Sequence, residues 1–165
     1  MRSVSEIITC RKEIVNKRRP QYRQDLQHLR MDIELSCEDK SIKTNMLIRR
    51  NINDLNNFTV ALKLLTPNEL GRATALLRFQ GPHGGQSEIL SISDLHNDYH
   101  IHYYSELDYL RKRKLPSVDN RRKANYDCIE GAIISFLDAC NIADPNGIFD
   151  EERDRMKQIT LFDEL

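Results

Sequence analysis

Hydrophobic and polar residues alternate over about residues 26–37, and the alternation is strict from His28 onward. The apolar residues occupy every second position, namely Leu29, Met31, Ile33, Leu35 and Cys37. A period of two is typical of a β-strand with one buried face and one face in water. The same pattern predicts four more strands, at residues 42–50, 58–65, 73–79 and 98–105.

Short turn-rich segments separate the first four strands, which favours an antiparallel meander. Apolar residues at helical spacing predict an opening helix over residues 4–15, after the N-cap residue Ser3, and a second helix over residues 121–141. We therefore expect an α+β fold, with an antiparallel sheet of about five strands and an N-terminal and a C-terminal helix packed on it. Residues 1–143 form this domain, and residues 144–165 are a charged tail.

Composition narrows the class of protein. The 165 residues are 39% hydrophobic and 30% charged, which is typical of one globular domain and excludes collagen-like and wholly disordered chains. The 25 basic residues balance the 25 acidic ones, which argues against a protein that mainly coats nucleic acid. The chain has no apolar run of membrane-spanning length, no signal peptide and no CxxC pair among its four cysteines. These features predict a cytoplasmic protein.

Histidines carry the strongest chemical signal. Four of the five histidines lie close together in the sequence, at His83, His96, His100 and His102. On a strand, His100 and His102 project from the same face about 6.5–7 Å apart, and His83 lies on a glycine-flanked loop. The three side chains fit a zinc or manganese site, and equally a metal-free general acid and base acting on a phosphodiester, with Arg78 as a phosphate contact. Nearby acids at positions 94, 98, 106 and 108 are candidates to orient an imidazole.

A structural interpretation stays open beside the chemical one. The strand that carries His100 and His102 is then polar surface, and His83 caps a turn.

The motifs LLRFQGPHGG (76–85) and DYHIHYYSE (98–106) and the helix NYDCIEGAIISFLDAC look like a family of bacterial and phage domains. In that uncharacterised family an LRYNGxH-type strand and loop precede a HIH strand and a closing helix. The resemblance covers roughly residues 30–142. The order of motifs is more distantly similar to toxins paired with nucleotidyltransferase-like antitoxins. It implies that His83, His100 and His102 are functional positions.

The end of the chain carries a second signal, the pentapeptide QITLF formed by residues 158–162. It resembles the bacterial sliding-clamp-binding motif, which implies a clamp partner bound through Gln158, Ile159, Leu161 and Phe162. The adjacent apolar anchors Leu161 and Phe162 fit an extended peptide that seats both side chains in a pocket. The alternative is a terminal helix that packs Phe149, Met156, Ile159 and Phe162 on the core.

Basic clusters occur at residues 49–50, 111–114 and 121–123, with tyrosines nearby. We expect Arg111, Lys112, Arg113 and Lys114 to be candidates for nucleic-acid contact, whereas the alternative is that the clusters are solvated surface.

Together these signals predict a bacterial or phage accessory protein that docks on the sliding clamp and acts on or near DNA, and the histidines add the expectation of a phosphodiesterase site. Two other hypotheses remain: a non-catalytic clamp adaptor or inhibitor, and a toxin-like ribonuclease of a toxin–antitoxin system.

Overall fold

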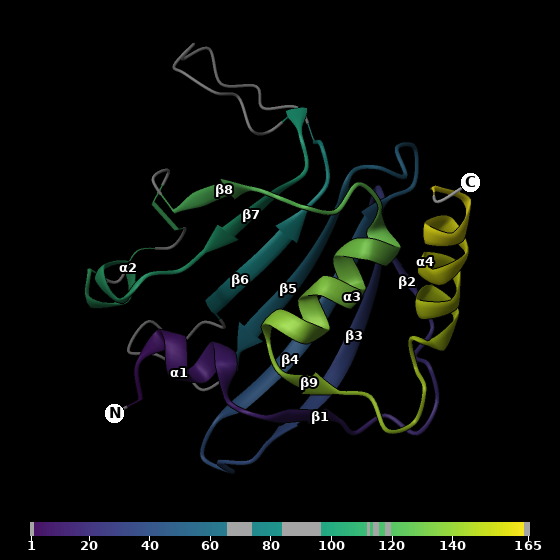
Figure 1. Cartoon of the computed structure of the whole chain (residues 1–165). Coiled ribbons are helices and arrows are strands. Elements are labelled where there is room, and N and C mark those ends of the chain that lie inside the picture. Colours follow the sequence, from purple (N-terminus) through teal and green to yellow (C-terminus); the bar gives the residue numbers. More distant parts are fainter. Residues whose placement is uncertain are drawn as a thin grey trace.

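Long strands formed by residues 28–64 make the centre of one large mixed sheet (Figure 1). The computed structural model describes residues 2–65, 74–83, 97–111, 113, 116–117 and 120–163, with the backbone alone for residues 160–163. Within this part of the chain the strands are β1 (Lys12–Ile14), β2 (Arg23–Asp25), β3 (His28–Cys37), β4 (Lys43–Asn51), β5 (Phe58–Leu64), β6 (Thr74–Gln80), β7 (His100–Tyr103), β8 (Arg121–Lys123) and β9 (Ile142–Ala143). The helices are α1 (Val4–Thr9), α2 (Glu106–Leu110), α3 (Ile129–Ala139) and α4 (Asp150–Asp163).

The strand order is β8-β7-β6-β5-β4-β3-β1-β9, and β2 pairs with β3. Consecutive strands from β3 to β8 pair antiparallel, and for β3 to β6 this confirms the prediction from their short connections. β1 and β9 form the parallel pair in this part of the sheet. The α+β class is therefore confirmed, but the expected number of about five strands is too small, because the described sheet has nine.

Helix α3 covers one face of the sheet and supplies the main core (Figure 1). Ile133 and Phe136 of α3 are buried against the strands, and the Phe136 ring meets Phe79 of β6 edge-on with centroids 5.3 Å apart. The apolar positions of the alternating strands line this face, among them Met31, Ile33, Met46, Ile48, Val60 and Leu62. A smaller cluster joins α1 to the end of the sheet through Val4, Ile7, Leu64, Leu76 and Tyr104.

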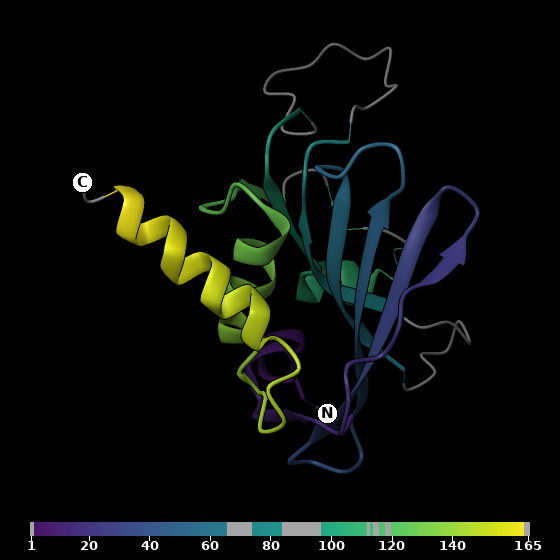
Figure 2. The same ribbon diagram turned by 90° about the vertical axis from the view of Figure 1, so that its right-hand side faces the viewer.

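The opposite face of the sheet is polar. Figure 2 shows α3 and α4 on one side of the sheet, and among the described elements no helix lies across the other face of β3, β4 and β5. Arg30 and Glu34 of β3 and Arg49 of β4 project from this face, and Glu34 and Arg49 are exposed. The expectation of strands with one wet face is confirmed for β3.

Both expected helices are shorter than predicted. The opening helix ends at Thr9 rather than at residue 15, because Cys10 adopts an extended conformation and Lys12–Ile14 joins the sheet beside β3 and β9. The helix expected over residues 121–141 begins at Ile129, because Arg121–Lys123 pairs with β7. Cys128 and Cys140 cap the two ends of α3, and all four cysteines are free thiols.

The tail expected over residues 144–165 contains a helix. Residues Asp150–Asp163 form α4, whose first turn carries Asp150, Glu151 and Glu152. Carboxylates at a helix N-terminus are favoured by the helix dipole, which explains why a highly charged segment is helical here. None of the helices in the described ranges is long and apolar enough to cross a membrane.

Candidate metal centre

His83, His100 and His102 lie together although they come from two segments of the chain. One ring nitrogen from each lies within 4.8 Å of those of the other two. The ring centroids of His83 and His100 are 5.1 Å apart, and those of His100 and His102 are 4.8 Å apart. The structure therefore brings together the three histidines that the sequence singles out.

The alternation of β7 places two of these rings side by side. Ile101 points into the core beneath α3, and so its neighbours His100 and His102 project from the opposite face. The antiparallel register pairs His100 with Gln80 and His102 with Arg78 on β6. The end of β6 lies beside the start of β7. His83 comes shortly after this end of β6 and therefore lies close to His100.

A close backbone contact fixes the path of the loop that carries His83. The amide N–H of Gly81 donates to the carbonyl of Phe58 at 3.1 Å. A Cβ atom on Gly81 would lie 1.8 Å from the carbonyl oxygen of Asn56, which is far inside van der Waals contact. Glycine is therefore required at this position, two residues before the first histidine of the cluster.

The cluster is shielded from solvent. His100 is 0% exposed and His102 is 3% exposed, whereas His83 is half-buried. This contradicts the interpretation of His100 and His102 as polar surface. Cavities of about 550, 430 and 470 Å³ in the described part of the protein are lined by other residues.

The orientation of His100 selects one ring nitrogen for chemistry. Its Nδ1 lies 2.8 Å from the carbonyl oxygen of Asp98. A carbonyl only accepts hydrogen bonds, so Nδ1 carries the proton and donates, and in the neutral ring Nε2 keeps its lone pair. A histidine that donates through one nitrogen to a backbone carbonyl is the usual arrangement of a metal-ligating imidazole.

Cationic side chains flank the histidines on the same face. Arg78 on β6 and Arg121 on β8 are the cross-strand neighbours of His102, and Lys123 is the neighbour of His100. The Nε of Arg78 is buried, and no described atom forms a hydrogen bond with it. Burial, and next the positive charge of Arg121, lower the pKa of Arg78. Since a guanidinium still keeps its proton at neutral pH, Arg78 offers a desolvated positive charge beside the cluster.

The acids expected near the histidines are engaged elsewhere. Asp98 forms an ion pair with Lys123 at 3.0 Å, a carboxylate oxygen of Glu106 accepts from the amide of Val4, and Asp108 caps α2. Asp94 and His96 lie outside the described residues. The described cluster therefore consists of imidazoles flanked by Arg78, Arg121 and the Lys123–Asp98 ion pair.

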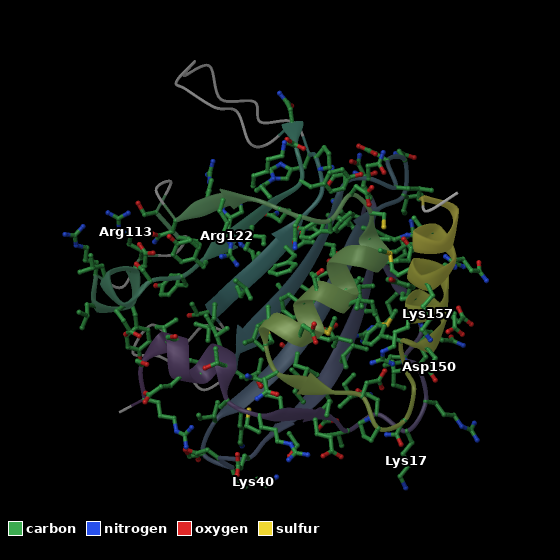
Figure 3. The ribbon with its side chains drawn as sticks, in the orientation of Figure 1. Lys17, Lys40, Arg113, Arg122, Asp150 and Lys157 are labelled. Carbon is green, nitrogen blue, oxygen red and sulfur yellow. The ribbon has the colours of Figure 1, made fainter. Side chains whose placement is uncertain are left out.

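The other candidate residues lie apart from the histidines. Arg111 ends α2, and Arg113 lies beside α2 with its Nε 3.7 Å from Asp108 (Figure 3). Lys112 and Lys114 are outside the described residues.

The terminal helix packs on α3 through its first half. Phe149, which precedes α4, is fully buried, Arg19 pairs with Glu152, and Arg155 lies 2.9 Å from Glu130 of α3. Gln158 and Ile159 are exposed. The extended conformation expected for residues 158–162 is not the one described, because Leu161 and Phe162 belong to the last turn of α4.

Sequence reasoning missed Gln80, which projects beside His100 and donates to Thr59 at 3.3 Å. The alternation of residues 73–79 could have identified Gln80. Continued by one residue, this pattern places Arg78 and Gln80 on one face of the strand.

Comparisons with protein-family models, with curated proteins and with solved structures find no match for this chain. The site is therefore interpreted from its own geometry.

Proposed function

We propose that the protein binds a divalent metal ion, zinc in preference to manganese, through His83, His100 and His102, and hydrolyses phosphodiester bonds at this site. The observation that carries the proposal is the convergence of the three imidazole nitrogens within 4.8 Å. Neutral imidazole suits zinc, whereas manganese favours carboxylate and carbonyl oxygens, which the described cluster lacks.

A zinc ion held by His83, His100 and His102 would supply a bound water as the nucleophile, as catalytic zinc sites with three protein ligands do. Zinc would lower the pKa of that water to about 7, which would make it nucleophilic at neutral pH. Water adds to phosphorus, the bond from phosphorus to the leaving oxygen breaks, and that oxygen takes up the proton released from water. Phosphate is the favoured substrate group because the buried Nε of Arg78, which has no hydrogen-bond partner among the described residues, lies on the strand next to His102.

The same side chains support metal-free acid–base catalysis as the competing mechanism. We favour the metal because the His100 Nδ1 contact to the Asp98 carbonyl leaves Nε2 as the coordinating nitrogen. A protein that works without metal keeps its activity after chelation, and this outcome would decide between the two.

The experiment measures hydrolysis of bis(4-nitrophenyl) phosphate by zinc-loaded and by chelator-dialysed protein. We expect activity with zinc, and a loss of roughly 100-fold or more in His83→Ala. His28→Ala is the matched control, because His28 lies on β3 and is not part of the cluster. Equal rates in the two histidine variants would refute the assignment.

We further propose that the carboxyl end docks on a bacterial sliding clamp through QITLF. The support is that Gln158 is exposed and that Ile159 is 48% exposed, beyond the part of α4 that contacts α3. Docking requires the last turn of the helix to unwind so that Leu161 and Phe162 both enter one pocket. Helix ends open at low free-energy cost, which makes this step accessible. The proposal places the protein in the cytoplasm with the clamp.

A peptide spanning residues 156–165, labelled with a fluorophore, tests docking on a purified bacterial clamp. We expect the full-length protein to displace the peptide and the double variant Leu161→Ala/Phe162→Ala to fail. A peptide that does not bind removes the clamp from the account and leaves the histidine site untouched.

A further inference from the structure

Side chains on the polar face of the sheet form a continuous row across six strands. The register joins Arg30 of β3, Arg49 of β4, Thr59 of β5, Gln80 of β6, His100 of β7 and Lys123 of β8. The hydrogen bond from Gln80 to Thr59 confirms that neighbours in this row share a face. Because adjacent strands lie about 4.8 Å apart, the row is about 24 Å long. Arg30, Arg49, Thr59 and Lys123 offer side-chain donors on this face, whereas Gln80 and His100 are buried and already donate to Thr59 and to the Asp98 carbonyl.

A second row runs beside the first and leads to the other buried histidine. It contains Asp32, Leu47, Ala61, Arg78, His102 and Arg121. Leu47 and Ala61, in the middle of this row, carry no charge. Arg78 therefore has no described carboxylate at ion-pair distance.

Positive charge predominates on this face. We use "basic face" for Arg30, Arg49, Lys63, Arg78, Arg121 and Lys123, which the register places on it together with the carboxylates Asp32 and Glu34. Asp32 is already engaged by Arg30, whose Nε lies 2.8 Å from it, and Lys123 is paired with the Asp98 carboxylate at 3.0 Å. Burial and then the charges of Arg30 and Arg49 lower the pKa of Lys63, against the opposing charge of Asp32. Like charges gathered in this way are stabilised by an anionic partner.

We infer that the basic face binds the sugar–phosphate backbone of a polynucleotide and guides it to the histidine cluster, so that nucleic acid is the substrate. This inference rests on the proposed phosphodiester hydrolysis and names its substrate class. A row about 24 Å long is far wider than a single phosphate ester needs, whereas it matches several successive phosphates of a strand.

The chemistry of the face indicates how the strand is held. The two rows contain no Phe, Tyr or Trp side chain, and the imidazole rings of His100 and His102 are buried, so the rows offer no exposed ring for base stacking. Binding then depends on phosphate contacts and is independent of sequence. Not every residue of the basic cluster at positions 49–50 belongs to this face. Arg49 projects from it, whereas the neighbouring Arg50 lies over the Tyr22 ring at 5.8 Å.

The test measures anisotropy of a fluorescein-labelled 20-nucleotide single-stranded DNA at several salt concentrations. Arg49→Gln/Lys63→Gln removes two cations from the basic face, and Lys17→Gln/Arg18→Gln removes the same two residue types from exposed positions in the loop after β1. Each phosphate contact contributes about 0.7 to the slope of log K against log salt for a single strand. We expect Arg49→Gln/Lys63→Gln to bind the oligonucleotide roughly tenfold or more weakly at low salt, with a slope of log K against log salt that is smaller by about 1.4. The control Lys17→Gln/Arg18→Gln should match the wild type in both affinity and slope.

Two further arms separate this inference from the proposed function. His83→Ala should bind the oligonucleotide like the wild type and fail to hydrolyse bis(4-nitrophenyl) phosphate, because His83 is part of the cluster and not of the basic face. A wild-type protein that hydrolyses this small ester but does not bind the oligonucleotide would overturn the inference and leave the proposed function standing. The inference would also be overturned if the two double variants weakened oligonucleotide binding equally. The same holds if polyglutamate, at an equal concentration of charge, fully displaced the oligonucleotide from the wild type.

Discussion

The ring centroids of His83 and His100 lie 5.1 Å apart, although one residue is on a loop after β6 and the other is on β7. Two features produce this proximity. The β6–β7 register sets the position of His100, and the close passage of Gly81 past Asn56 sets the position of the loop.

Gly81→Ala should displace the loop that carries His83. The new methyl group would overlap the Asn56 carbonyl, so the backbone must move. We expect a loss of roughly 1–3 kcal/mol in the free energy of unfolding, measured with urea, together with weaker zinc binding. A variant with wild-type stability and zinc affinity would show that the tight passage does not position the histidine.

Tyr126→Phe should weaken the contact between the segment that precedes α3 and the histidine strand β7. The buried Tyr126 hydroxyl lies 2.8 Å from the carbonyl of His100 and 3.2 Å from that of Gln80. Burial raises the pKa of this phenol, so it remains a donor at every physiological pH. We expect a cost of about 1–2 kcal/mol in urea unfolding. Tyr103→Phe, at an exposed ring on the same strand as His100, should cost less than about 0.5 kcal/mol.

Asp108→Asn should make the protein less sensitive to acid. Burial opposes ionisation of Asp108, but hydrogen bonds from Ser105, Ser117 and Asn120 outweigh it and hold the pKa of the folded carboxyl below its usual value. A lowered folded pKa gives stability that is present above the unfolded pKa of about 3.9 and is lost as the pH falls through the folded value.

The measurement for Asp108 is the urea midpoint between about pH 6 and pH 3. The wild type should lose more stability over this range than Asp108→Asn, which has no carboxyl to protonate at this position. Parallel curves for the two proteins would contradict the assignment.

Two phenylalanines near the carboxyl end should behave differently. Phe149 is fully buried, and Phe149→Ala should cost about 3–5 kcal/mol. If Phe162 is an anchor for a clamp, Phe162→Ala should change the free energy of unfolding by less than about 0.5 kcal/mol and abolish clamp binding. A large loss of stability in Phe162→Ala would mean that its ring packs within the protein, and the docking proposal would fail.

Sequence alternation predicts the central strands well and the short strands poorly. The strand expected over residues 26–37 is observed as His28–Cys37, because ten residues of period two have no helical alternative. The apolar residues of the segment 4–15 fit a helical period, but the helix ends at Thr9. The rest of the segment is extended because this conformation buries Ile14 in the sheet. Strands of two or three residues, such as β8 and β9, contain too few positions to show a period.

The candidate site was predictable in part. The clustering of histidines along the chain pointed to His83, His100 and His102, and alternation put the last two on one face. The near-complete burial of these two rings was not predictable, since a polar strand face is ordinarily exposed. Lys12 was missed in the same way, because only the fold places its Nζ within 2.7–3.1 Å of the carbonyls of Ile8, Cys10 and Cys140.

Calorimetric titration of the full-length, chelator-dialysed protein with zinc tests the central claim most directly. The account predicts one zinc ion per chain, at least tenfold weaker binding in His83→Ala and His102→Ala, and unchanged binding in the His28→Ala control. It also predicts that affinity falls as the pH is lowered below about 6.5, because protons compete for imidazole. Absence of zinc binding in the folded wild type, or equal binding in His83→Ala and His28→Ala, would contradict the three-histidine metal site.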